Sequence, residues 1–299
     1  MQIFVNDDCS TYFNNFDEGK IDLCIADPPY FRVLKKEKWD RFSDKDAYIE
    51  FTRDWAQALV DKMRFSGTLA LYGCSVNVDI MCKINEVLEN LGMEFVQEIV
   101  IDKGIKSMAG RIPKSLKMLP PVSENIFIYR KDAKPFVRKL LLEKARQSGL
   151  STTEIKERLG IPLNGGGNWT KWTGKTEFPL LPTEENWKKI CDLFLINIPY
   201  NSIRETYNGQ IGLTNVWNDI DFYIRDRIHP SEKPVKLADR LIRLFSNMGD
   251  IVAIPFAGSG NDIIACRQSG RQYVATEVNI DIYNKAKNRI DFFFNSFDK

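Results

Sequence analysis

Histidine is almost absent from this sequence, and cysteine never occurs in a ligand-like pair. His229 is the single histidine, and the six cysteines are scattered without a C-x-x-C spacing. Protein zinc sites are built from clustered cysteines and histidines, so a zinc site would lack ligands here. Most of the cysteines lie in apolar surroundings, where a buried thiol is the ordinary expectation, and we assign them no chemistry. We therefore expect a mechanism without a metal.

Long apolar runs are missing as well. No uninterrupted segment approaches the ~20 apolar residues that a membrane span needs. Residues 1–8 also contain no basic stretch ahead of an apolar run, so no targeting segment is indicated. These absences argue against a membrane partner and predict a cytoplasmic protein. With 299 residues, of which 43% are hydrophobic and 27% charged, the chain can bury a substantial core.

The net charge of the whole chain is small, but positive charge is concentrated in one region. The net charge is only +2, yet residues 101–175 contain 16 Lys+Arg against 6 Asp+Glu, which leaves 26 against 34 in the rest of the chain. Lysine and arginine release condensed counterions when they contact phosphates, so a basic block on a compact body suits a nucleic acid. A solvated basic face without a partner is the alternative.

Short apolar runs that are typical of strands alternate with segments of helical periodicity over most of the chain. Strands are predicted at residues 21–26, 67–73, 95–101, 125–129, 250–254 and 272–276, and helices at 46–64, 80–91 and 261–269. Strands that alternate with helices predict a mostly parallel sheet with helices on both faces. Residues 137–195 differ, because they predict helices without an obvious strand between them. We interpret that segment as a separate helical insertion.

One loop carries more chemistry than any other segment. The predicted strand at 21–26 stops at Asp27-Pro28-Pro29-Tyr30. An exocyclic amine of a nucleobase is a poor nucleophile because its lone pair is delocalised into the ring, and two acceptors on its N–H bonds can localise that pair. Asp27 supplies a carboxylate, Pro28 a carbonyl on a rigid loop, and Tyr30 a face for base stacking. The alternative is a strand-ending turn in which Asp27 caps backbone amides.

A second candidate site lies nearer the C-terminus. Gly258-Ser259-Gly260 forms the turn of a strand-turn-helix-strand pattern, and Glu277 stands at the tip of the second strand. In nucleotide-binding units of this kind, glycines let the backbone approach the ligand and the acid accepts hydrogen bonds from ribose hydroxyls. The third glycine of the dinucleotide fingerprint is missing, so a tight turn without a ligand is the alternative.

Together these segments resemble the β class of DNA amino-methyltransferases. That family has a D-P-P-Y loop first, a recognition insert second, and an H-P-T-x-K-P segment followed by D-P-F-x-G-S-G last. This chain has the loop at residues 27–30, HPSEKP at 229–234 and IPFAGSG at 254–260, in the same order. Residues 6–9 (NDDC) also resemble the family's G-D-C segment. The resemblance covers about residues 3–136 and 226–290.

The resemblance implies a fold, a cofactor and a reaction. The fold is α/β: a Rossmann-like S-adenosylmethionine-dependent methyltransferase domain with a mostly parallel, doubly wound sheet and a helical recognition insert. Residues 1–136 would form the catalytic half, 137–225 the insert and 226–299 the cofactor-binding half. The expected activity is site-specific methyl transfer from S-adenosylmethionine to N6 of a flipped-out adenine in double-stranded DNA. Transfer would be direct, without a covalent enzyme intermediate.

The resemblance also assigns roles to individual residues. Phe256, Gly258 and Gly260 would wall the methionine end of the cofactor, Glu277 would hold its ribose, and Asp8 would contact its adenine. The catalytic residues would be Asp27, Pro28, Pro29 and Tyr30. The cofactor-binding residues would be Asp8, Cys9, Asp27, Lys233, Phe256, Gly258, Ser259, Gly260 and Glu277.

Two departures from the family pattern bear on activity. Ile254 stands where the family usually has aspartate, so a polar contact toward the cofactor's amino group is missing, and Asn261 replaces a usual threonine. A DNA-binding protein with weakened catalysis on the same scaffold is therefore one alternative. Cytosine N4 is another, and adenine is preferred because the family's N4-cytosine members more often begin the loop with serine. RNA or protein-amide methylation is disfavoured, because related amide methyltransferases usually place the cofactor motif first.

The helical insert is the expected DNA reader. Residues 139–150 and 151–159 resemble a helix-turn-helix with Gly149 at the turn and a capping box, Ser151-Thr152-Thr153-Glu154, opening the second helix. A helical hairpin used for packing or dimer contact is the alternative. The candidate DNA-binding residues are Lys103, Lys106, Arg111, Thr152, Lys156 and Arg158. The family resemblance also suggests a homodimer and a cognate restriction enzyme as partners.

Overall fold

The computed structural model describes residues 1–31, 40–73, 78–104, 119, 121–163, 168–174, 176, 178–223, 227–228 and 231–295. The chain divides into two compact units. The first, here called the sheet unit, comprises Met1–Met63, Gly67–Arg130 and Thr206–Lys299. The second, the helical unit, comprises Arg64–Ser66 and Lys131–Glu205. The sheet unit is thus assembled from both ends of the chain.

Eight strands of the described chain form one sheet in the order β1-β8-β7-β2-β3-β5-β4-β6. Their bounds are β1 Gln2–Val5, β2 Ile21–Ala26, β3 Met63–Gly73, β4 Met93–Asp102, β5 Ser123–Lys131, β6 Val216–Trp217, β7 Ile251–Ile254 and β8 Gln272–Thr276. The pairs β1–β8, β8–β7, β7–β2, β2–β3 and β4–β6 are parallel, whereas β3–β5 is antiparallel. The predicted α/β fold with a mostly parallel sheet is confirmed.

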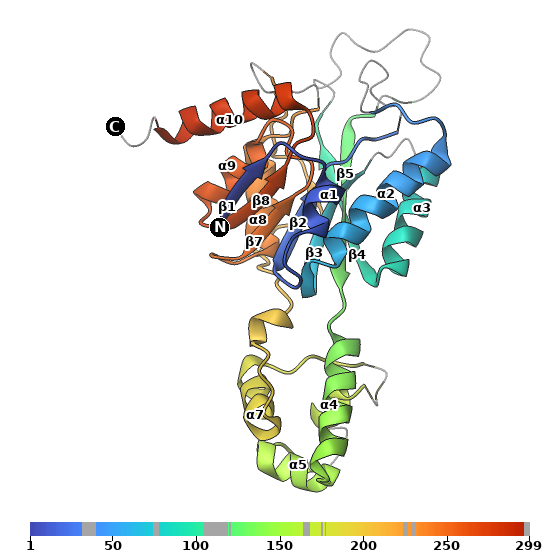
Figure 1. The fold of residues 1–299 in the computed structure, drawn as a ribbon, viewed down its shortest axis with the longest axis vertical. Helices are drawn as coiled ribbons and strands as arrows, with labels where there is room; N and C mark the ends of the chain where they lie inside the picture. Colours follow the sequence, from blue (N-terminus) through green and yellow to red (C-terminus); the bar gives the residue numbers. More distant parts are fainter. Residues whose placement is uncertain are drawn as a thin grey trace. The chain divides into compact units, whose positions relative to one another are not determined.

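Helices cover both faces of this sheet, as Figure 1 shows. On one face the buried core includes side chains of α1 (Cys9–Asn14), α2 (Lys45–Val60) and α3 (Val78–Asn90). On the other it includes α8 (Val235–Phe245), α9 (Asn261–Gln268) and α10 (Ile280–Asn295).

The central strand β2 contributes side chains to the cores on both faces of the sheet. Leu23 and Ile25 belong to the core under α8 and α9, while Cys24 and Ala26 belong to the core under α1 to α3. Successive side chains of a strand point to opposite faces, so a strand covered on both sides needs apolar residues at every position. This explains why five of the six residues at 21–26 are apolar. The exception, Asp22, accepts a hydrogen bond from Ile251 N at 2.9 Å.

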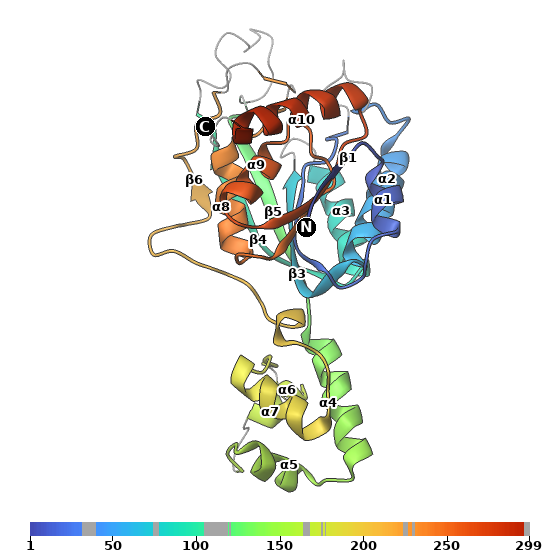
Figure 2. The ribbon, with the colours of Figure 1, turned by 60° about the vertical axis from the view of Figure 1, so that its left-hand side comes forward.

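The helical unit, whose helices are drawn in Figure 2, has a hydrophobic core of its own. Its elements are α4 Lys134–Ser148, α5 Thr152–Leu159, α6 Asn168–Trp172, α7 Glu184–Phe194 and a 3-10 turn at Tyr200–Ser202. Three tryptophans, Trp169, Trp172 and Trp187, are buried in this core. The predicted capping box is confirmed, since Ser151 and Glu154 cap each other's backbone amides. Gly149 ends α4 in the left-handed region at φ +67°, as a residue without a Cβ does most easily.

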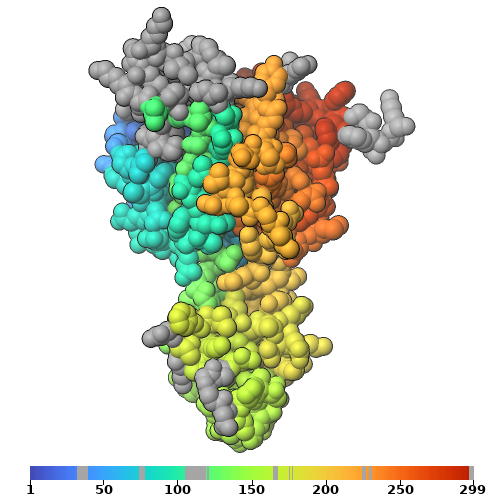
Figure 3. Space-filling view, turned by 180° about the vertical axis from the view of Figure 1, so that it is seen from behind, coloured from blue at the N-terminus to red at the C-terminus, as the bar shows by residue number. Residues whose placement is uncertain are grey.

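The insert differs in extent from the predicted residues 137–225. The helical unit runs from Lys131 to Glu205, and the chain after it belongs to the sheet unit. There β6 pairs with β4, and Trp217, Ile220 and Phe222 are buried in the core that contains α8 and α9. Figure 3 shows this segment, in orange, on the surface of the sheet unit. A two-residue edge strand is too short a pattern to be recognised in the sequence.

No helix in the described part of the chain is long and apolar enough to cross a bilayer.

Candidate active site

A cavity of about 350 Å³ opens at the carboxyl ends of β2, β7 and β8. Its walls come from the Asp27 loop after β2, the turn at 255–259 after β7 and the Glu277 loop after β8. The chain leads from β2 to β3 on one side and from β7 to β8 on the other. Ligands of open α/β sheets bind at such a switch point, beyond the carboxyl ends of the strands.

The Asp27 carboxylate accepts two hydrogen bonds at one end of this cavity. Tyr30 donates its hydroxyl to Oδ1, and the Lys233 amino group donates to Oδ2 at 2.9 Å. Lys233 Nζ also donates to the Tyr30 hydroxyl oxygen at 3.0 Å and to the Ser231 carbonyl at 3.2 Å. It lies 5.3 and 5.0 Å from the ring centroids of Tyr30 and Tyr72. The Asp27 loop and the 231–234 segment are thereby joined at Lys233.

Electrostatics keep these groups in fixed protonation states. Burial acts to lower the pKa of Lys233, but the carboxylates of Asp27 and Glu124 outweigh it, so the pKa lies above its ordinary value. Burial, followed by the charge of Asp27, raises the pKa of the Tyr30 hydroxyl well above its ordinary value. At neutral pH the lysine is therefore charged and the tyrosine is a hydrogen-bond donor.

Burial and a hydrogen bond from α2 fix the two prolines of the loop. Pro28 is buried, and the Pro29 carbonyl accepts a 2.6 Å hydrogen bond from the Tyr48 hydroxyl of α2. From the sequence, Tyr48 is recognisable only as a member of a predicted helix. Its contact with the loop depends on how α2 packs against β2, which no local pattern contains. A rigid loop of this kind holds its carbonyls in fixed directions.

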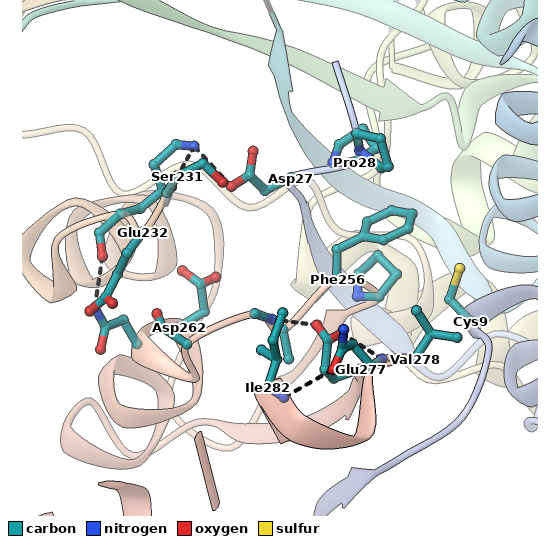
Figure 4. A pocket seen from close by; sticks show the side chains of 18 of the residues that line it. Cys9, Asp27, Pro28, Ser231, Glu232, Phe256, Asp262, Glu277, Val278 and Ile282 are labelled. Atoms are coloured by element: carbon teal, nitrogen blue, oxygen red, sulfur yellow. Dashed lines mark hydrogen bonds and ion pairs between the residues drawn. The ribbon is translucent and has the colours of Figure 1, made fainter. Parts of the chain in front are cut away.

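The predicted cofactor residues gather around the remainder of the cavity (Figure 4). The Phe256 ring contacts Phe51 and Trp55, with centroids 6.2 and 5.6 Å apart. Gly258 has φ +49°. No atom lies within 4 Å of the position that a Cβ would occupy there, so open space lies beside its backbone. The neighbouring Ser259 is buried and lines the same wall. Together they leave an accessible backbone next to an aromatic face.

Glu277 is held by two backbone amides. Its carboxylate oxygens accept from Gly258 N at 3.0 Å and from Asn279 N at 2.8 Å. Burial raises the pKa of this carboxyl, and the two amides oppose the shift. A carboxylate has about four acceptor sites, so about two remain for ligand hydroxyls.

Asp8 and Cys9 also line the cavity. The Asp8 side chain caps α1, accepting from Thr11 N at 3.0 Å. Burial, and then the charge of Asp8, raises the pKa of the Cys9 thiol to about 12. Cys9 is therefore a protonated, unreactive thiol, and in Figure 4 it lies at the end of the cavity opposite Asp262.

Of the predicted cofactor-binding residues, only Gly260 is not among the described residues that line the cavity. Its φ is +80°, and a Cβ there would come within 2.8 Å of the Ile290 side chain of α10. Its small size serves the close packing of α9 and α10.

A network that sequence reasoning missed supports Lys233 from behind. Asn261 donates to Glu232 Oε1 at 2.9 Å and to the Lys233 carbonyl at 2.8 Å. Arg289 of α10 pairs with the same Glu232 oxygen and donates to Asn261 Oδ1 at 3.3 Å. In the sequence, Asn261 stands out only as a replacement for threonine. Its longer, two-ended amide explains the change, since one side chain bridges two segments.

Asp262 was not predicted as a site residue. It follows Asn261 in the first turn of α9, lines the cavity and is 9% exposed. Burial, and then the charge of Asp27, raises the pKa of its carboxyl to about 7, although Lys233 opposes the shift. No motif in the sequence singles out an acid at this position, because its burial arises only when α9 packs against the sheet.

The candidate DNA-binding residues that the structure describes fall in both units. Lys103 pairs with Glu124 at 3.2 Å and faces the Phe222 ring. Thr152 and Arg158 are exposed on α5. Lys156 is buried, and its amino group donates to the Leu163 carbonyl at 3.1 Å, so it is unsuited to a phosphate contact. Lys106, Arg111 and His229 lie outside the described residues.

No cluster of three or more His, Cys, Asp or Glu residues in the described ranges could hold a metal ion. The arrangement offers a carboxylate acceptor and an aromatic side chain on a proline loop that lines a cavity of small-molecule size. Such a site can bind an amine by its N–H groups next to a second ligand in the same cavity.

Comparison with known proteins bears on this geometry. The profile of the N6/N4 methyltransferase family, described as DNA methylase, matches residues 21–288. The type II methyltransferase M.HpaI of Haemophilus parainfluenzae is 25% identical over 289 residues, which cover 95% of this chain and 72% of the relative. The type II methyltransferase M1.MboII of Moraxella bovis is 25% identical over 281 residues, which cover 93% of this chain and 92% of the relative.

Solved structures share the fold. TTHA0409 from Thermus thermophilus, in complex with S-adenosyl-L-methionine, has a TM-score of 0.56 at 18% identity and covers 98% of this chain and 94% of its own. The M1.HpyAVI complex with the same cofactor has a TM-score of 0.58 at 15% identity, covering 97% and 100%. The cytosine-N4-specific PvuII DNA methyltransferase has a TM-score of 0.54 at 12% identity, covering 98% and 90%.

Proposed function

Because the chain belongs to the N6/N4 DNA methylase family, whose members use S-adenosylmethionine, we propose that it methylates N6 of adenine in double-stranded DNA. The observation that carries the proposal is the Asp27 carboxylate, held by Tyr30 and Lys233 at one end of the cavity. The motifs of the sequence alone indicate the same family.

The amine would be held by the catalytic loop. Asp27 keeps about two acceptor sites beyond those used by Tyr30 and Lys233, and one of them would accept an N–H of the base. The Pro28 carbonyl would accept the other N–H, while Tyr30 would stack on the flipped base. Tyr48 would keep the loop rigid through its bond to Pro29. Holding the amine at a near-attack distance accounts for much of the rate in such reactions.

The residues around the remaining cavity fit the cofactor. Glu277 would accept hydrogen bonds from the ribose hydroxyls, and the accessible backbone at Gly258 allows a close approach. Phe256 and Ser259 would wall the cavity, and Asp8 and Cys9 would line its far end. The bound sulfonium supplies an electrophilic methyl group. The chain's own part is to orient the two partners and exclude water.

The helical unit would read the DNA. Thr152 and Arg158 are exposed on α5, whose N-terminus is fixed by the capping box and whose approach is set by Gly149. Such a helix can enter the major groove. Lys103, Lys106 and Arg111 remain proposed phosphate contacts, whereas the buried Lys156 is left out of the set.

Adenine is preferred because the loop begins with Asp27, whereas N4-cytosine members of the family more often have serine there. DNA methylated by the wild-type protein would be digested to nucleosides and analysed by mass spectrometry. N6-methyladenine with no N4-methylcytosine is the expected product. The reverse result would replace the adenine assignment with cytosine, and the variant Asp27→Ala should produce neither.

One observation favours a second candidate, a DNA-binding protein with weakened catalysis. Ile254 is fully buried in the sheet core, so it provides no polar contact for the cofactor. Calorimetric titration with S-adenosylmethionine separates the candidates. We expect micromolar binding that Glu277→Ala abolishes, with Glu18→Ala, which changes an exposed acid, as the control. Intact DNA affinity without cofactor binding would favour the second candidate.

The relatives' designation as type II methyltransferases suggests a partner. We propose that a restriction enzyme with the same recognition site accompanies this protein, and that the protein acts as a homodimer. Sequencing of methylated DNA would give the site, and light scattering of the purified protein would give its mass.

A further inference from the structure

The Asp262 carboxylate is buried in the cavity wall without a hydrogen-bond partner for one of its oxygens. Among the described residues no donor reaches Oδ1, and the whole residue is 9% exposed. It lines the cavity together with Asp27, Lys233 and Phe256, and Figure 4 shows it across the cavity from Cys9 and Val278. Oδ1 itself is closed off from solvent, so a ligand in the cavity could meet only the other oxygen, Oδ2, and the charged carboxylate is costly there unless a cation pairs with it.

The protein's own cation at this end is already engaged. Lys233 donates to Asp27, Tyr30 and the Ser231 carbonyl. The groups that act electrostatically on Asp262 or respond to it are Asp27, Lys233, Tyr72 and Cys266. Glu124 also lies 3.9 Å from Lys233. Glu124 also pairs with Lys103 at 3.2 Å, so three carboxylates face two ammonium groups and one negative charge is left in excess.

The family's usual acid is replaced nearby by Ile254. Ile254 ends β7, is fully buried in the sheet core and stands outside the described cavity lining. Eight positions later, Asp262 places a carboxylate in the first turn of α9, where it lines the cavity. The cavity therefore has an acid in α9, although the end of β7 lacks one.

We propose that the Asp262 carboxylate binds the α-ammonium group of S-adenosylmethionine, in the place that Ile254 leaves empty of polar contacts. This inference rests on the proposed cofactor site. The sulfonium is the less suitable partner, because its methyl must face Asp27 and Pro28 for transfer. A purely structural acid in a helix's first turn interacts with the helix dipole and needs neither burial nor a ligand.

Calorimetric titration of the full-length protein with three ligands tests the proposal. S-adenosylmethionine and S-adenosylhomocysteine both carry the ammonium group, whereas 5′-methylthioadenosine lacks the amino-acid moiety. Asp262→Asn should weaken the first two by about 10-fold to 100-fold, as expected for a hydrogen bond to a charged group. Its affinity for methylthioadenosine should stay within about twofold of wild type. The matched control is Asp281→Asn, an exposed acid in the first turn of α10.

Each other outcome has a definite meaning. Equal affinities of wild type and Asp262→Asn for all three ligands would overturn the proposal, as would weakening of S-adenosylmethionine alone, which would point to the sulfonium. If Asp262→Asn fails to fold, Asp262→Ser is titrated under the same criteria. Wild-type protein that binds none of the three ligands would instead refute the proposed cofactor site itself.

Discussion

Lys233 donates a 2.9 Å hydrogen bond to Asp27, although the two residues are 206 positions apart in the chain. The bond joins the loop after β2 to the segment before α8, which come from the two ends of the sheet unit. Because the Asn261 and Arg289 network holds that segment from behind, the position of Asp27 depends on α9 and α10 as well as on its own loop.

Lys233→Met should damage both stability and catalysis. It leaves the Asp27 carboxylate without its cation in a buried site, and removing one partner of a buried pair costs about 3–5 kcal/mol. Denaturant unfolding and a methylation assay would measure the two effects. Lys236→Met is the control, since Lys236 pairs with Asp219 at 3.1 Å on the exposed surface and should cost less than about 1 kcal/mol. Equal losses in both variants would contradict the assigned role.

Asp262→Asn should make the cofactor-free protein more stable at neutral pH. Burial raises the carboxyl's pKa to about 7, so the folded state binds this proton more tightly than the unfolded state, whose value is near 3.8. The stability that proton binding contributes is present below about pH 4 and is lost as pH rises through 7. A shift of about 3 units corresponds to at most about 4 kcal/mol. Urea unfolding at pH 5, 6, 7 and 8 would measure it, and a pH-independent difference between variant and wild type would contradict the prediction.

The two glycines of the turn should respond differently to alanine. Gly260→Ala places a Cβ 2.8 Å from Ile290 at φ +80°, so we expect a loss of about 2–4 kcal/mol from strain and overpacking. Gly258→Ala at φ +49° meets no atom and should cost only about 1–2 kcal/mol. Its methyl stands beside the cavity, so cofactor affinity should fall. Thermal unfolding and calorimetry would distinguish the two, and the same profile for both would be inconsistent with the structure.

Arg158→Ala should weaken DNA binding without changing the fold. Arg158 is exposed on α5, and loss of one phosphate contact reduces the slope of log affinity against log salt by about 1. Fluorescence anisotropy at several salt concentrations would give the slope. Lys287→Ala, which removes an exposed cation from α10, serves for comparison. An unchanged slope in Arg158→Ala would remove this residue from the proposed DNA contacts.

The sequence predicted the elements whose patterns are long or whose ends have distinct chemistry. The strand at residues 21–26 is observed as predicted, and so is the capped start of α5 at Ser151. β3 begins at Met63, four residues before the predicted Gly67, because the apolar pattern before the glycine was assigned to a helix. β1 was not predicted. Its four residues are only partly covered, so they carry no clear alternation.

The candidate site was likewise predicted only in part from the sequence. Asp27, Gly258 and Glu277 lie in recognisable motifs, and the structure brings them to one cavity. The supporting contacts escaped prediction, since each depends on packing between distant segments. Tyr48 reaches Pro29 from α2, and Arg289 reaches Glu232 from α10. No spacing in the sequence encodes those approaches.

The burial of β2 on every side has a consequence for how the protein is made. All six of its residues are buried, and one of its two neighbouring strands, β7, begins about 225 residues after β2 ends. At ~5–20 residues per second, a ribosome takes roughly 10–45 s to synthesise that interval. During this time the nascent chain holds a strand that is apolar at five of its six positions and has one unpaired edge, a form prone to association with other chains. Escape from aggregation during translation therefore depends on protection of that edge until the C-terminal third of the protein emerges.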